Sequence, residues 1–296
     1  MSVYSIKDLE HLSGIKAHTI RIWEQRYNLF SPQRTATNIR FYNDDDLKLI
    51  LNIASLKNHG IKISKIVALP KEALAQEVEK IGREQLSHED QISALTIAMI
   101  DLDERSFTSV LDECIGKLGF ERAMLEIVYP FMRKIGILWM INSINPAQEH
   151  FISHLVRQKL IVATDEAQVN ESSPLFLLFL PEGELHELGI LYANFLLRSQ
   201  GFRTVFFGQT VPLEALEEVY HKLNPDYLMT AMTTAPDPNE VHQFVKQLGG
   251  KFKDSKVYIT GSRVIDEEIE LPSNVKILRQ FEDLSQLTRA ITLDEA

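Results

Sequence analysis

The segment 174–296 alternates short apolar runs with amphipathic stretches, and this alternation constrains the fold more than any other feature. The runs are PLFLLFLP, FRTVFFG, DYLMTAMTT, KVYITG and VKIL. Short runs that are apolar on both faces are typical of strands inside a parallel sheet. The stretches between them have one apolar face, as surface helices do. The pattern therefore predicts a doubly wound, flavodoxin-like parallel sheet.

Ligands of such sheets bind beyond the carboxyl ends of the strands. The candidate loops are 181–189, 208–212, 232–237 and 261–263. In the first of them, His186 is expected in the first turn of a helix over 185–201. A neutral imidazole there can bind a metal through one nitrogen while Glu184 holds the N–H of the other. The alternative is a partly exposed histidine beside a helix start.

Charge divides the chain unevenly. Residues 1–75 carry 11 Lys/Arg and 7 Asp/Glu, a net charge of +4, whereas the remainder carries 20 and 34, a net charge of −14. Only the N-terminal part is therefore expected to meet a polyanion. Within it, a short helix that Gly14 ends is followed at once by a second helix, which predicts a helix-turn-helix. Ile20 and Trp23 of the second helix are expected in its core.

The stretch 4-YSIKDLEHLSGIKAHTIRIWEQRYNLFSPQRTATNIRFYNDDDLKLI-50 resembles the N-terminal domain of the MerR family of transcriptional regulators. The residues that match the family pattern are Thr19, Arg21, Trp23, Glu24, Arg34, Arg40 and Tyr42. The resemblance implies a winged helix-turn-helix domain over 1–75 that binds a double-stranded DNA operator. The expected contacts to base edges and phosphates are Lys16, Thr19, Arg21, Arg26, Arg34, Arg40 and Tyr42, the last through its hydroxyl. The alternative is a solvated basic face.

Residues 85–168 have helical spacing with few breakers and predict a four-helix bundle. One motif in it, 139-WMINSINPAQEH-150, places Trp139 at the end of one helix and Glu149 and His150 in the first turn of the next. These three residues either line a pocket or serve the fold, with Trp139 in the core and Glu149 complementing the helix dipole. The single cysteine, Cys114, excludes an internal disulfide and is expected to be a core residue.

The sequences Glu184-Leu185-His186-Glu187-Leu188-Gly189 and 208-GQTVP-212 resemble motifs of the cobalamin-binding domain found in methionine synthase, corrinoid proteins and mutases. The bundle before them resembles the helical cap that covers the corrin. The spacing of Trp139, Glu149 and His150 resembles the cap of MerR-type, B12-dependent photoreceptor regulators called CarH or LitR. The resemblance covers nearly the full chain and implies a helical cobalamin cap over 85–168 and a Rossmann-like cobalamin-binding domain over 174–296.

This resemblance implies adenosylcobalamin as the cofactor, with methylcobalamin as the alternative, and His186 as the cobalt ligand. The implied cofactor residues are Trp139, Glu149, His150, Glu184, His186, Gly189, Val211, Thr230, Met232, Gly261 and Ser262. Three positions depart from the family pattern. Glu184 stands where the enzymes have Asp, Ser262 replaces a glycine, and Met140 stands where light-sensing relatives have a histidine.

Three functions remain open. The first is a repressor, not an enzyme, whose oligomeric state and DNA affinity answer to cobalamin and light, with a second copy and RNA polymerase as partners. The second is a MerR-like regulator with a cobalamin-free sensor domain, and the third is a corrinoid methyl carrier, against which the helix-turn-helix argues. No apolar run reaches the roughly 18 residues that span a bilayer, and no signal peptide is recognised. We expect a cytoplasmic protein that makes no membrane contact.

Overall fold

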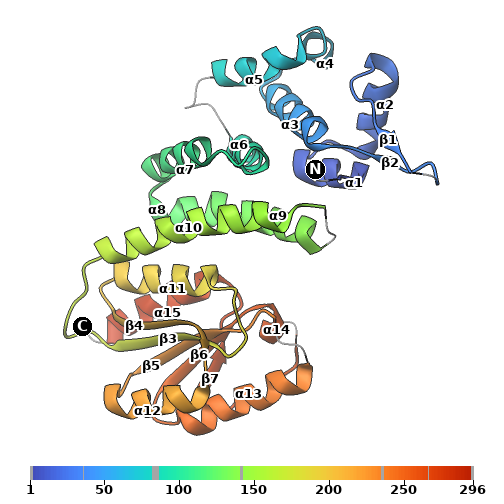
Figure 1. Cartoon of the computed structure of the whole chain (residues 1–296). Helices are drawn as coiled ribbons and strands as arrows, with labels where there is room; N and C mark the ends of the chain where they lie inside the picture. The colour runs from blue at the N-terminus through green and yellow to red at the C-terminus, as the bar shows by residue number, and fades with distance from the viewer. Residues whose placement is uncertain are drawn as a thin grey trace. The chain divides into compact units, whose positions relative to one another are not determined.

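A computed structural model describes residues 3–35, 37–81, 87–140, 143–234, 237–265 and 267–294 (Figure 1). The chain divides into two compact units, Met1–Leu155 and Val156–Ala296, and the division falls inside helix α10 (Pro146–Glu166). No helix among the described residues is long and apolar enough to cross a membrane.

The first unit begins with α1 (Ile6–Ser13) and α2 (Ala17–Tyr27), followed by a small antiparallel hairpin of β1 (Gln33–Arg34) and β2 (Arg40–Phe41). Ser5 and Asp8 form a capping box that starts α1. Gly14 ends it in the left-handed region, with φ 70°, which allows the short turn into α2. Ile20 and Trp23 are buried, so the prediction that they belong to the core is confirmed.

Helix α3 (Asp44–Asn58) starts at Asn43, which caps it together with Asp46. It is followed by α4 (Ile63–Ile66) and α5 (Lys71–Lys80). Most of α3 is buried because α1, α5 and α6 all pack against it.

The helical bundle consists of α6 (His88–Ile100), α7 (Glu104–Leu118), a third helix in three segments, and the start of α10. The three segments are α8 (Phe120–Ala123), a π-helical turn (Met124–Val128) and α9 (Tyr129–Met140). Pro130 has no amide hydrogen to continue the ladder, and the turn widens so that the Tyr129 amide donates to the Met124 carbonyl. Cys114 is fully buried, as predicted, and burial raises the pKa of its thiol to about 11.

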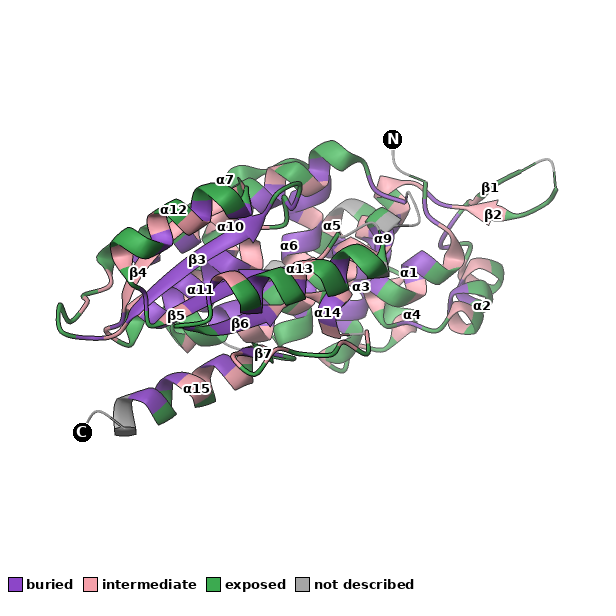
Figure 2. Cartoon of the chain, turned by 90° about the horizontal axis from the view of Figure 1, so that it is seen from below, coloured by how far each residue is buried: buried purple, intermediate pink, exposed green. Residues whose placement is uncertain are grey.

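The second unit contains a parallel sheet with the order β4-β3-β5-β6-β7, which confirms the doubly wound prediction. Its strands are β3 (Leu175–Pro181), β4 (Arg203–Val211), β5 (Tyr227–Ala231), β6 (Lys256–Thr260) and β7 (Val275–Ile277). Every residue of β3 is buried, as Figure 2 shows, because it pairs with a strand on each side and is covered on both faces.

Helices cover both faces of this sheet (Figure 1). One face carries α11 (Leu188–Ser199) and α15 (Phe281–Asp294), and the other carries α12 (Leu213–Leu223) and α13 (Pro238–Lys251); the short α14 (Ser262–Ile265) follows β6. Helix α11 begins at Leu188 rather than at residue 185, so the expectation that His186 lies in its first turn is wrong. The Glu184 side chain accepts a hydrogen bond from the His186 amide and thereby holds a turn ahead of the helix.

Candidate functional site

The sheet brings the residues predicted after its separate strands to one edge, because the carboxyl ends of parallel strands meet there. At this edge, Glu184 is buried and lies beside the exposed His186 side chain, with 2.8 Å between Glu184 Oε1 and His186 Nδ1. The pairing fixes which imidazole nitrogen faces the protein, so Nε2 is the nitrogen with which the ring can bind a metal.

Glu184 also joins two loops. Its Oε2 accepts hydrogen bonds from the amides of Thr233 and Thr234, at 2.6 and 2.8 Å, and from the Thr234 hydroxyl at 3.0 Å. Burial raises the pKa of the Glu184 carboxyl. The hydrogen bonds from the His186 ring and amide and from the two threonine amides lower it by more, so the pKa lies well below its ordinary value. A carboxylate that is ionised at neutral pH therefore orients the imidazole.

Sequence reasoning missed the two threonines. They follow the third strand of the sheet, in a loop that had been identified as part of the ligand edge, but no motif marks amides that point at a carboxylate. Only the fold shows that this loop closes over Glu184.

Thr230, near the end of β5, is fully buried, and its Oγ1 has no hydrogen-bond partner among the described residues. A buried hydroxyl without a hydrogen-bond partner lowers the stability of the fold. Its position at the ligand edge is consistent with a bound molecule that would supply the missing hydrogen bond. This orphaned hydroxyl and the oriented imidazole are the two observations by which the residues present fit a cobalamin.

Gly261 has a structural reason of its own. Its φ is +108°, and a Cβ there would lie 2.2 Å from the carbonyl oxygen of Met232, so no other residue fits without displacement. Met232 itself is buried and its amide donates to the Thr260 carbonyl. Ser262 is exposed and its hydroxyl lies 3.4 Å from the Thr233 carbonyl. The serine therefore sits beside the loop that holds Glu184.

Gly189 lies in the first turn of α11, and a Cβ built on it would meet nothing within 4 Å. No described part of the protein therefore fills the space beside Gly189. Val211 ends β4 and is partly buried. The preceding Gln209 ties that loop to the first one, because its side-chain amide donates to the Leu185 carbonyl at 2.6 Å.

The remaining predicted cofactor residues belong to the first unit. Trp139, in the last turn of α9, is 49% exposed, which excludes the alternative that it is a core residue. Glu149 lies in the first turn of α10 and its Oε2 is 3.2 Å from Nδ1 of His150, whose side chain is 74% exposed. The Ser153 hydroxyl donates to Glu149. Met140's side chain lies outside the described residues.

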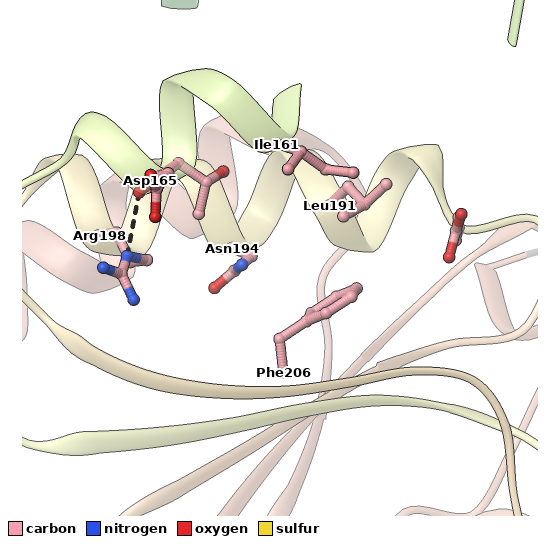
Figure 3. A pocket seen from close by; sticks show the side chains of 8 residues that line it. Ile161, Asp165, Leu191, Asn194, Arg198 and Phe206 are labelled. Carbon is pink, nitrogen blue, oxygen red and sulfur yellow. Dashed lines mark hydrogen bonds between the residues drawn. The ribbon is translucent and has the colours of Figure 1, made fainter. Parts of the chain in front are cut away.

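A cavity of about 310 Å³ lies in the second unit, between the end of α10, α11 and β4 (Figure 3). It is lined by Ile161, Thr164, Asp165, Glu187, Leu191, Asn194, Arg198 and Phe206. None of the residues predicted for the cofactor lines it. Its size is at the lower end for small-molecule sites, and one of its lining residues, Glu187, directly follows His186 in the chain.

The elements predicted to read DNA carry exposed cations. Lys16 is the N-cap residue of α2 and pairs with Glu10 at 3.1 Å, while Arg21 and Arg26 are exposed along the helix. Arg34 is exposed on the hairpin and donates to Asn38. Thr19 is partly buried on α2. Helix α2 and the hairpin thus present the basic groups that a winged helix-turn-helix needs.

Two of the predicted DNA contacts, Tyr42 and Arg40, pack or pair within the fold. The Tyr42 hydroxyl is buried, without a partner among the described residues, and the ring packs edge-on against Phe30; burial raises its pKa to about 12. The expected contact of this hydroxyl with a phosphate is therefore wrong for this conformation. Arg40 is tied to Glu24 at 3.1 Å, with its side chain 27% exposed, and is less accessible than the other cations.

Comparisons with known proteins agree with these observations. Residues 4–72 match the family described as "MerR HTH family regulatory protein", and residues 91–164 match "B12 binding domain". The chain is 31% identical to "HTH-type transcriptional repressor CarH" of Myxococcus xanthus over 231 residues, 76% of this chain and 77% of that protein. It is 27% identical to "HTH-type transcriptional repressor CarA" of the same organism over 237 residues, 79% and 78% of the two chains.

Among solved structures, the monomethylamine corrinoid protein of Methanosarcina barkeri matches with a TM-score of 0.53 and 15% identity, over 70% of this chain and all of that one. This likeness shows the fold. The class that the fold and the family matches define is a MerR-type transcriptional regulator with a B12-binding domain. The chain belongs to the family of CarH-like regulators, related to the CarH and CarA repressors.

Proposed function

We propose that this regulator is a repressor that binds cobalamin at the His186 edge of the sheet and that the bound cofactor controls its oligomeric state and DNA affinity. Adenosylcobalamin is the proposed form, with methylcobalamin as the alternative. The observation that carries the proposal is the buried, ionised Glu184 that orients an exposed imidazole.

Bound cobalamin would supply a cobalt ion that an imidazole can ligate and a light-sensitive cobalt–carbon bond. In this chain, His186 would hold the cobalt. Glu184 would accept the Nδ1–H of His186 and thereby raise the basicity of the Nε2 nitrogen. Thr230 would give its buried hydroxyl to the cofactor, and Gly189 would leave the start of α11 open.

The cap residues would contact the bound cofactor and sense its state. The exposed Trp139 and the Glu149–His150 pair are available for this role. A change of oligomer requires that the cofactor's states bind two assemblies with different affinity. Because MerR-type domains read paired half-sites, we propose a dimer or tetramer on the operator, in the cytoplasm, with RNA polymerase as a further partner and no enzymatic activity.

The test is an absorption spectrum of the full chain mixed in the dark with adenosylcobalamin, desalted, and recorded before and after green light. The variant is His186→Ala, and the matched control is His242→Ala, an exposed histidine on α13 of the same unit. We expect retained corrin colour in the parent and the control, a loss of imidazole ligation in His186→Ala, and a spectral change on illumination.

The other functions predict other results. A chain that retains no corrin colour would be a MerR-like regulator with a cobalamin-free sensor domain, for which Ser262 and Met140 are the supporting departures. A corrinoid carrier would exchange methyl groups with a methylated donor and would bind no operator.

A further inference from the structure

A buried carboxylate joins the DNA-binding helices to the loop before α10. Asp8, in the first turn of α1, is 5% exposed, and its Oδ2 accepts a hydrogen bond from the Ser143 hydroxyl at 3.1 Å. Ser143 is itself 6% exposed. The two residues are 135 positions apart in the sequence, so the bond connects the DNA-reading part of the first unit with its helical bundle.

Ser143 lies inside the motif that carries the predicted cap residues. Its amide donates to the Leu138 carbonyl at 2.8 Å, and the adjoining Ile144 is also buried, so this part of the loop is anchored. Trp139 precedes the anchor and His150 follows it, and both are exposed. Ser143 therefore lies in the chain between these two exposed residues.

Asp8 needs this donor. A buried carboxylate is stable only when hydrogen bonds replace its lost hydration. The capping box supplies one such bond, from the Ser5 amide to the same Oδ2, at 2.6 Å. The Ser143 hydroxyl supplies another, and moving the loop would remove it.

From α1 the path continues to the DNA-reading helix. Glu10 on α1 accepts a hydrogen bond from the Ala17 amide at 3.1 Å and pairs with Lys16 at 3.1 Å. These two residues form the N-terminus of α2. The position of α1 thus fixes the end of α2 that meets base edges.

We propose that Ser143 is a positioning residue that couples the cap loop, residues 143–145 ahead of α10, to α1. The state of this loop would then change the DNA affinity of α2. This inference rests on the proposed function for the signal that moves the loop, whereas the contact itself is independent of any cofactor. The coupling depends on one contact, between the Ser143 hydroxyl and the Asp8 carboxylate.

The experiment uses the full chain and its operator DNA. Ser143→Ala removes the hydroxyl, Ser143→Thr keeps it, and Thr96→Val is the control, since the buried Thr96 hydroxyl donates within its own helix, to the Ile92 carbonyl. DNA affinity is measured with and without adenosylcobalamin in the dark, beside the corrin spectrum. Hydrogen exchange of α1 is measured without cofactor.

We expect Ser143→Ala to retain the parent's corrin spectrum while the ratio of its two DNA affinities shrinks about two- to tenfold, the range for one hydrogen bond. Hydrogen exchange in α1 should rise in Ser143→Ala. Ser143→Thr should keep both the affinity ratio and the exchange of the parent. In an Asp8→Ala background, Ser143→Ala should have no further effect. Thr96→Val should change neither.

An unchanged affinity ratio together with unchanged exchange in α1 would overturn the inference even if cobalamin binds. If the parent binds no cobalamin, the proposed function fails, and exchange in α1 alone decides the coupling. A rise confined to Ser143→Ala would then support the contact, and equal exchange in all variants would refute it.

Discussion

Oε1 of Glu184 lies 2.8 Å from Nδ1 of His186, while Oε2 of the same carboxylate accepts the amides of Thr233 and Thr234. One buried group therefore orients the imidazole and closes the loop after β5. The two tasks are coupled, since any change that moves the threonine loop also moves the carboxylate that holds the ring.

Glu184→Gln should lower the free energy of unfolding at neutral pH by about 1–3 kcal/mol, because amide hydrogens would face backbone donors. The folded-state pKa of Glu184 lies below its ordinary value of 4.5, so the ionised group stabilises the fold above that pH and the stabilisation is lost as the pH falls below it. Urea unfolding of the full chain at several pH values, followed by circular dichroism, measures this. Equal pH slopes for parent and variant would contradict it.

Thr230→Val should raise the free energy of unfolding without cofactor by about 1 kcal/mol, because it removes a buried hydroxyl that has no partner in the described part of the chain. The same change should weaken cobalamin binding, since the methyl group cannot donate. Thr260→Val is the matched control: its hydroxyl donates to the Leu278 carbonyl at 2.8 Å, and its loss should destabilise the chain. Destabilisation by Thr230→Val would show that the hydroxyl has a partner after all.

Gly261→Ala should destabilise the chain by about 1–3 kcal/mol through backbone strain alone, because φ is +108°. The collision of the new methyl group with the Met232 carbonyl should add to this cost. Gly189→Ala should leave stability unchanged or slightly raised, since the space is open and alanine favours a helix. If cobalamin approaches α11, Gly189→Ala should nevertheless lower its affinity. Thermal unfolding and cobalamin titration of both variants separate the two roles.

Arg21→Ala should weaken operator binding and reduce the slope of log affinity against log salt by about 1, as expected for one phosphate contact. Tyr42→Phe should leave both quantities unchanged, because its hydroxyl is buried. Arg40→Ala should instead destabilise the fold, since it leaves the largely buried Glu24 side chain without its cation. Binding isotherms over a salt series test the first two changes, and thermal unfolding tests the third. A loss of affinity in Tyr42→Phe would show that its hydroxyl does contact a phosphate.

The sequence by itself determined the elements and their order. The apolar runs predicted all the strands of the sheet, and the helical spacing predicted the bundle. These features are local, because each depends on periodicity within one short segment. The Glu184–His186 pairing was also within reach, since the two residues are neighbours in the chain.

The tertiary structure alone decided the contacts between distant segments. The Thr233 and Thr234 amides on Glu184, the burial of the Tyr42 hydroxyl, the exposure of Trp139 and the Ser143–Asp8 bond all join residues far apart in sequence or depend on what packs around them. A side chain's burial follows from its neighbours in space rather than from its neighbours in the chain. For that reason the residue types indicated a DNA-reading helix and a metal-binding edge, while only the packing showed which of their side chains are accessible.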